Sequence, residues 1–189
     1  MLVNGLNDAI EIASGYSHTC VIMGSTGGCQ CWGQNGFGQL GTGTTSNKNM
    51  PGAVIGLESI RLTSVTTGRG HSCATTSAYD VYCWGYNAFG QLGIGSRASQ
   101  LLATLVPNIK ATSVTAGEFH TCAITLQKNV KCWGAMDEFP PESTAYAGQL
   151  GTGKKIGSEK NCEHQFFAST FTLILCAGLV PLLVTNPLV

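Results

Sequence analysis

Charged side chains are scarce in this chain, and the few that are present cancel one another. Asp, Glu, Lys and Arg make up 11% of its 189 residues, and ten acidic side chains balance ten basic ones. Typical soluble domains are about 25% charged. A neutral chain creates no net field that would attract the phosphates of DNA or RNA, so the composition argues against a nucleic-acid partner.

Catalytic patterns are lacking as well. The sequence holds no set of Ser, His and Asp, no pair of carboxylates and no cofactor-binding motif that stands apart from its internal repeats. The strings GQLGTG and GQLGIG have no Lys of a phosphate-binding P-loop. Turns that need positive φ explain their glycines better. We therefore expect neither enzymatic activity nor a cofactor.

A secretory leader is also lacking, because the opening MLVNGLNDAIEIASG is acidic and mixed rather than basic and apolar. The nine cysteines nevertheless are many for a protein of the reducing cytosol. Cysteine usage favours an extracellular or cell-surface location, with the cytoplasm as the alternative. In the first case, a leader would belong to sequence outside this chain.

What the sequence does contain is one unit written three times. The copies are GYSHTC, CWG and GQLGTG (15–43), GRGHSC, CWG and GQLGIG (68–95), and GEFHTC, CWG and GQLGTG (117–153). His18, His71 and His120 recur at intervals of 53 and 49 residues. This period is in the range of propeller blades, and 25 glycines with short β-branched runs suit strands and tight turns. We predict an all-β chain.

Each unit also predicts a hairpin that pairs two cysteines. If the turn of the third unit is centred on Gln127, Cys122 lies opposite Cys132, and the same arithmetic sets Cys73 opposite Cys83. Directly opposed residues have Cβ atoms about 4.5–5.5 Å apart, close to what a disulfide spans. In the first unit Cys20 and Cys31 are eleven residues apart, so we expect GSTGG to hold one extra residue in a glycine-assisted bulge. The predicted disulfides are Cys20–Cys31, Cys73–Cys83 and Cys122–Cys132.

The ordered string G-x-x-H-T/S-C, about ten residues, and C-W-G-x-N-x-F-G-Q-L-G-x-G resembles the repeat of the regulator of chromosome condensation family, in its cysteine-bearing version. The resemblance covers residues 3–153, with units around 3–43, 54–95 and 106–153. It implies a β-propeller, usually of seven blades of four antiparallel strands, whose members mostly bind proteins. The founding member exchanges nucleotide on the Ran GTPase, and a bacterial relative inhibits β-lactamases.

Only about three units are present, and the first begins in the middle of a repeat. Three blades of an expected seven leave open flanks. We expect a partial propeller of the regulator of chromosome condensation type: a fragment, a truncated product, or a part that needs the remaining blades or another chain to close the ring.

The repeated side chains have a structural interpretation and a chemical one. A His and a Cys two residues apart can both ligate zinc, yet the pairs sit in separate units and no fourth ligand is offered. We therefore predict no metal site. We predict instead that one histidine per unit packs inside the blade, as the resemblance to the family implies, and that one tryptophan per unit does so because it recurs at the same strand position. These residues are His18, His71, His120, Trp32, Trp84 and Trp133.

Three cysteines have no partner in the repeat: Cys29, Cys162 and Cys176. A catalytic role for Cys162 beside His164 is disfavoured, because no group that would orient the histidine is offered.

The end of the chain departs from the repeat. Residues 154–189 form a divergent tail, and from Gln165 to Val189 it carries no charge. Its length suffices to cross a bilayer, which needs about 20 apolar residues. Against a span, Pro181 interrupts the apolar run. A membrane anchor and a divergent, poorly ordered end stay open as alternatives.

The sequence thus predicts a non-enzymatic scaffold that binds a protein of unknown identity through loops at one face. Guanine nucleotide exchange on a small GTPase and a secreted inhibitor or adhesion module are the alternatives. The most individual loop is the insertion AMDEFPPESTAYA (135–147), which replaces four residues of the other units. The candidate contact residues in it are Asp137, Glu138, Phe139, Glu142 and Tyr146.

Overall fold

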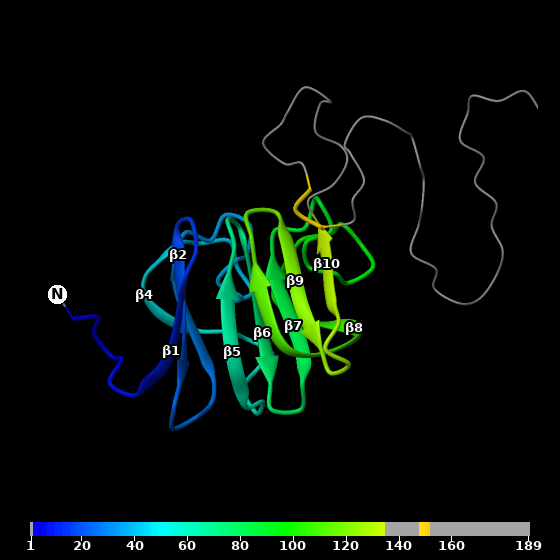
Figure 1. Ribbon diagram of the computed structural model, residues 1–189. Helices are drawn as coiled ribbons and strands as arrows, with labels where there is room; N and C mark the ends of the chain where they lie inside the picture. The colour runs from blue at the N-terminus through cyan, green and yellow to red at the C-terminus, as the bar shows by residue number, and fades with distance from the viewer. Residues whose placement is uncertain (1, 135–147, 152–189) are drawn as a thin grey trace, which may run out of the picture. The chain divides into compact units, whose positions relative to one another are not determined.

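The structure is a computed structural model that describes residues 2–134 and 148–151. All of these residues belong to one compact unit, Met1–Ile156. The described residues form ten β-strands joined by turns (Figure 1). Among them, no helix is long and apolar enough to cross a membrane.

The first four strands make one antiparallel sheet, which we call blade 1. They are β1 (Ala9–Ser14), β2 (His18–Met23), β3 (Cys29–Gly33) and β4 (Lys48–Ala53), in the spatial order β1-β2-β3-β4. The central strand β2 has no exposed residue, because it is flanked by β1 and β3 and packed against the next blade. Up-and-down order with short connections is the construction of a propeller blade.

The remaining six strands make a second sheet that contains two blades. They are β5 (Leu62–Thr67), β6 (His71–Thr76), β7 (Asp80–Gly85), β8 (Gln100–Ala116), β9 (His120–Thr125) and β10 (Val130–Gly134), in the order β10-β9-β8-β7-β6-β5. Residues 100–105 and Lys110 of β8 pair with β7, and residues 111–116 pair with β9. The long strand β8 therefore ends one blade and begins the next. We call β5 to residue 106 blade 2, and residues 111–134 blade 3.

The core lies where adjacent blades meet. One cluster joins Ile22 and Leu40 of the first repeat to Leu57, Val65 and Trp84 of the second. A second cluster joins blade 2 to blade 3 through the side chains of Val81, Leu92, Val106, Val114 and Ala123. Burial of apolar area between neighbouring sheets is what stabilises a stack of repeats. The predicted all-β fold and partial propeller are confirmed.

The extra residue of the first hairpin lies in its turn, not in a bulge. The ladder between β2 and β3 is regular, with Ile22 opposite Cys29 and Cys20 opposite Cys31. The longer turn uses Gly27, whose φ of +67° is in the left-handed region that favours glycine. The bulge predicted for this turn was therefore wrong. The irregularities in the described strands of blade 1 are between Ala9 and Glu11 on β1 and between Cys31 and Gly33 on β3, where it pairs with β4.

Candidate functional site

The three hairpins hold the predicted cysteine pairs directly opposite one another. The Sγ atoms of Cys20 and Cys31 are 2.11 Å apart, and those of Cys73 and Cys83 are 2.15 Å apart. In blade 3 the Cys122 and Cys132 Sγ atoms are separated by 2.08 Å. Each pair sits at disulfide distance in the middle of its blade. These cross-strand positions have a structural rather than a catalytic geometry.

Cys29 adds a third sulfur to the first pair. The Sγ atoms of Cys20, Cys29 and Cys31 all lie within 4.8 Å of one another, and all three side chains are buried. Because Cys20 and Cys31 are bonded to each other, Cys29 is the one thiol of this group. Burial raises the pKa of the Cys29 thiol to about 12, and the nearby carboxylate of Glu11 adds to the effect. A thiol that stays protonated is a poor nucleophile and a poor metal ligand.

The repeated histidines connect one blade to the next. His18 Nε2 lies 2.8 Å from the hydroxyl of Ser72, and His71 Nε2 lies 2.9 Å from that of Thr121. His18 and His71 are buried, whereas His120 of blade 3 is half-buried. Each of the first two histidines thus reaches the residue that follows the histidine of the next repeat.

The proton positions in this link follow from counting donors. The Ser72 hydroxyl donates its single proton to the backbone carbonyl of Gln39, at 2.8 Å. His18 must therefore donate from Nε2 to the Ser72 oxygen. Thr121 donates to the Gln91 carbonyl in the same way, at 2.8 Å. The link therefore needs a proton on Nε2 of each of these two histidines.

Burial keeps these histidines neutral. It lowers the pKa of His18 to about 4. The pKa of His71 falls to about 3, first because of burial and then because of the neighbouring His18 and His120. Burial also lowers the pKa of His120, which is more exposed. Their role is therefore to hold blades together rather than to transfer protons near neutral pH.

The repeated tryptophans complete the same junctions. Trp84 Nε1 donates to the Gln39 carbonyl at 2.9 Å, and Trp133 Nε1 donates to the Gln91 carbonyl at 2.9 Å. Trp84 is fully buried, while Trp32 and Trp133 are half-buried. Tryptophan is thus a junction residue, and the two more exposed rings belong to the first and the third blades.

The side chains two residues before each repeated histidine form a different kind of cluster. They are Tyr16, Arg69 and Glu118, one from each blade. The guanidinium of Arg69 lies 5.1 Å from the ring centroid of Tyr16 and forms an ion pair with Glu118. All three side chains are exposed. The side chains at this one repeat position therefore contact one another across three blades. They form a line of polar and aromatic contacts at the surface.

Aromatic side chains extend this line. The Arg69 guanidinium also lies 5.4 Å from the ring centroid of Phe119, and Phe119 is 5.0 Å from Phe89. Tyr86 joins Phe89 to Phe37, with ring centroids 5.9 Å and 4.6 Å away. We call these seven residues the recognition face: Tyr16, Phe37, Arg69, Tyr86, Phe89, Glu118 and Phe119.

Local structure places the recognition face at one end of the blades. Tyr16, Arg69 and Glu118 lie in the short turns before β2, β6 and β9, and Tyr86 directly follows β7. The Asn of each CWGxN string fixes the loop that follows, because Asn87 accepts from the Leu92 amide and donates to the Ser96 and Ala98 carbonyls. Phe89 in that loop is thereby held against its neighbours.

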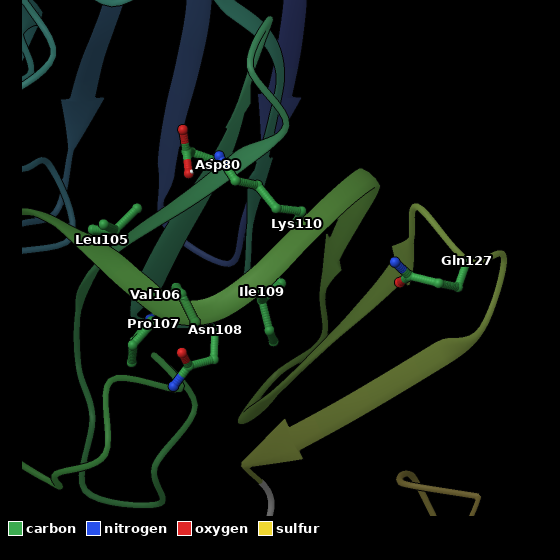
Figure 2. A pocket seen from close by; sticks show the side chains of 8 residues that line it. All are labelled: Asp80, Leu105, Val106, Pro107, Asn108, Ile109, Lys110 and Gln127. Carbon is green, nitrogen blue, oxygen red and sulfur yellow. Dashed lines mark hydrogen bonds and ion pairs between the residues drawn. The ribbon is translucent and has the colours of Figure 1, made fainter.

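A hollow of about 440 Å³ lies elsewhere, around the bend of β8 (Figure 2). Pro107 and Asn108 form the bend, and Asn108 has a φ of +58°. The two charged side chains that line the hollow bond to each other, with Lys110 Nζ 2.6 Å from an Asp80 carboxylate oxygen. Lys110 Nζ also donates to the Ala78 carbonyl. This hollow therefore offers a ligand no unpaired charge, and we do not assign it as the site.

Sequence reasoning missed the recognition face. The predicted contact residues Asp137, Glu138, Phe139, Glu142 and Tyr146 lie outside the described residues, as does the tail. The signal for the face was available in the repeats: constant Gly, His and Cys flank a position that changes from Tyr to Arg to Glu. The constant Gly, His and Cys are buried or half-buried, whereas the variable position is exposed in all three blades.

Comparisons with known proteins agree with this architecture. The family described as "Regulator of chromosome condensation (RCC1) repeat" matches residues 27–75 and 80–124. A second family of the same description matches residues 9–39, 62–91 and 111–138. Similar curated proteins include the ultraviolet-B receptor UVR8 of Arabidopsis thaliana, 39% identical over 49% of this chain and 21% of the receptor. The probable E3 ubiquitin-protein ligase HERC4 of Homo sapiens is 33% identical over 53% of this chain and 10% of the ligase.

Solved structures show the same fold. Prp20p from Saccharomyces cerevisiae has a TM-score of 0.68 and 24% identity over 80% of this chain and 37% of that chain. Human WBSCR16 has a TM-score of 0.62 and 18% identity over 67% of this chain and 33% of that protein. The chain spans about a fifth or less of the curated relatives named above. Its matched segments together run from residue 9 to residue 138, and the chain belongs to the regulator of chromosome condensation repeat family.

Proposed function

We propose that this chain is a non-enzymatic protein-recognition scaffold that binds its partner through the recognition face. The observation that carries the proposal is the line from Tyr16 through Arg69 to Glu118, in which one repeat position of three blades supplies exposed, mutually contacting side chains. The Gly, His and Cys that flank this position are constant and are buried or half-buried, so the scaffold holds the face in place.

The chemistry of the face suits a protein surface. Aromatic side chains and arginine are the residues most enriched at the centres of protein interfaces, because they bury large areas and still hydrogen-bond. Here Arg69 lies near the rings of Tyr16 and Phe119, so little side-chain freedom is lost on binding. We infer a partner that offers apolar side chains together with hydrogen-bond acceptors.

Relatives support a protein partner. Prp20p, which resembles this chain in fold, is described with binding to Gsp1p and histones, and yeast RCC1 (Prp20) has been solved bound to Kap60. The insertion at 135–147 is included in the proposal, because it begins at the repeat position that Tyr86 occupies in blade 2. Asp137, Glu138, Phe139, Glu142 and Tyr146 are then the additional contacts we propose.

Site-directed photo-crosslinking tests the proposal. A photoreactive amino acid replaces Tyr16 in one variant and Tyr79 in a control, since Tyr79 is an exposed aromatic at the distant β6–β7 turn. We expect one protein to be captured from the native source by the Tyr16 variant and not by the control. Adding Arg69→Ala should abolish that capture. Equal capture from both positions would contradict the assignment of the face.

A further inference from the structure

The two junctions inside the chain are built from equivalent side chains. We call the side of a blade that meets the previous blade its leading face, and the opposite side its trailing face. On the leading faces of blades 2 and 3, Val65 and Val114 are 4% and 5% exposed. They are equivalent, because Val65 pairs with Ala74 and Val114 pairs with Ala123 at the same register. Each is buried by the blade before it.

The leading face of blade 1 carries the same kinds of side chain without a cover. Ile12 is the register equivalent of Val65 and is 66% exposed. Thr19 and Trp32 occupy the repeat positions of Ser72 and Trp84. Within residues 2–134 and 148–151, neither the Thr19 hydroxyl nor Trp32 Nε1 has a hydrogen-bond partner. This face therefore presents an aliphatic side chain and two hydrogen-bond donors. The equivalent donors of blades 2 and 3 are hydrogen-bonded at the two internal junctions.

The trailing face of blade 3 carries the side chains that would complete a junction with the leading face of blade 1. Ile124 and Val130 are 45% and 68% exposed, whereas their equivalents Ile22 and Val81 are fully buried. The imidazole of His120 has no hydrogen-bond partner among the described residues. In blades 1 and 2 the same imidazole donates to a hydroxyl of the following blade.

We propose that the leading face of blade 1 in one copy of this chain docks on the trailing face of blade 3 in a second copy. Ile12 would cover Ile124 and Val130, and His120 Nε2 would donate to the Thr19 hydroxyl as His71 does to Thr121. The two faces are different surfaces, so the contact is head-to-tail. Two such contacts would close a ring of six blades, within the range of four to eight that propellers use. This contact uses the flanks of the blades and is independent of the recognition face.

A complementation experiment tests this arrangement. The full chain is compared by sedimentation velocity with Ile12→Asp and Val130→Asp, each of which buries a charge in one face only. Tyr79→Asp is the control, since Tyr79 is also an exposed apolar side chain (47%) but lies at a turn. We expect the wild type and the control to dimerise and each face variant alone to be at least about tenfold weaker, because buried unpaired charges are costly at interfaces.

Mixing the two face variants gives the result that only a head-to-tail contact produces. The Ile12→Asp copy keeps an intact trailing face and the Val130→Asp copy an intact leading face, so the mixture should form one-to-one dimers with a single good junction. Far-UV circular dichroism and thermal unfolding of each variant check that the blades are folded. A monomeric wild type would overturn the proposal. So would variants that dimerise as well as the wild type, or a mixture that associates no better than its components.

Discussion

Trp84 Nε1 donates a hydrogen bond to the backbone carbonyl of Gln39, 2.9 Å away and 45 residues earlier in the chain. The same carbonyl accepts from the Ser72 hydroxyl, which in turn accepts from His18. One backbone oxygen of blade 1 thus binds two side chains of blade 2. The repeated His and Gln of one blade and the repeated Trp of the next blade thus form a single blade-to-blade joint. This explains why the three residues recur together.

Removing the hydroxyl from this joint should destabilise the protein. Thr121→Val keeps the volume of the side chain but leaves the His71 Nε2–H without an acceptor, which costs about 1–3 kcal/mol in a buried site. Thr121→Ser keeps the hydroxyl, as Ser72 does in blade 2, and should cost less. Urea unfolding of the two variants measures the difference. An equal or reversed order would contradict the hydrogen-bonded link between His71 and Thr121.

The glycine of the QLG string should be irreplaceable where it faces a tryptophan. A Cβ added at Gly93 would lie 2.6 Å from Trp133 Nε1, whereas one added at Gly90 would meet nothing within 4 Å. Both residues have positive φ, at +69° and +75°. Gly90→Ala should therefore cost about 1–2 kcal/mol from backbone conformation alone. Gly93→Ala should cost about 1–3 kcal/mol more from overpacking, as chemical unfolding of both variants would measure.

The repeats made the blades, the hairpins and the opposed cysteines predictable, because the fixed spacing between the two cysteines of a unit determines which residues of its two strands lie opposite each other. They did not reveal that His18 bonds to Ser72, since that contact joins residues 54 positions apart in different blades. Nor did spacing decide between a bulge and a longer turn around Gly27, because both accommodate one extra residue. The contacts of the recognition face were not predicted for the opposite reason: Tyr16, Arg69 and Glu118 differ from one another, and similarity between repeats marks only the constant positions.

Stability should fall in mild acid. The folded pKa values of His18 and His71, about 4 and 3, are below the ordinary 6.5 of an unfolded histidine. The unfolded chain therefore binds more protons, and stability is complete above about pH 6.5 and is lost as the pH falls toward 3–4. At pH 5 each buried histidine should lower the free energy of unfolding by about 2 kcal/mol relative to its value at neutral pH. Unfolding free energies at pH 7.5 and pH 5 measure this, with His71→Gln predicted to flatten the dependence.

The cysteines of the described blades should fall into two classes. Under non-reducing conditions, peptide mapping should recover Cys20–Cys31, Cys73–Cys83 and Cys122–Cys132, while Cys29 should resist iodoacetamide until the protein is unfolded, because it is buried. Each disulfide closes a loop of ten or eleven residues and should stabilise the fold by about 3 kcal/mol. Recovery of Cys29 in a disulfide would contradict the pairing.

The central claim is that a protein partner binds the line from Tyr16 through Arg69 to Glu118. The direct test is the Kd of the partner captured by crosslinking, measured for the wild type, Arg69→Ala and Arg69→Lys, with Tyr79→Ala as the control. Arg69 is exposed and its ion pair contributes about 0–1 kcal/mol to folding, so the variants should stay folded.

We predict that Arg69→Ala weakens binding at least about tenfold, as truncation at the centre of an interface does. Arg69→Lys should fall between Arg69→Ala and the wild type, because lysine keeps the charge but not the planar contact with the rings of Tyr16 and Phe119. Tyr79→Ala should leave the Kd unchanged. A Kd for Arg69→Ala equal to that of the wild type would contradict the account.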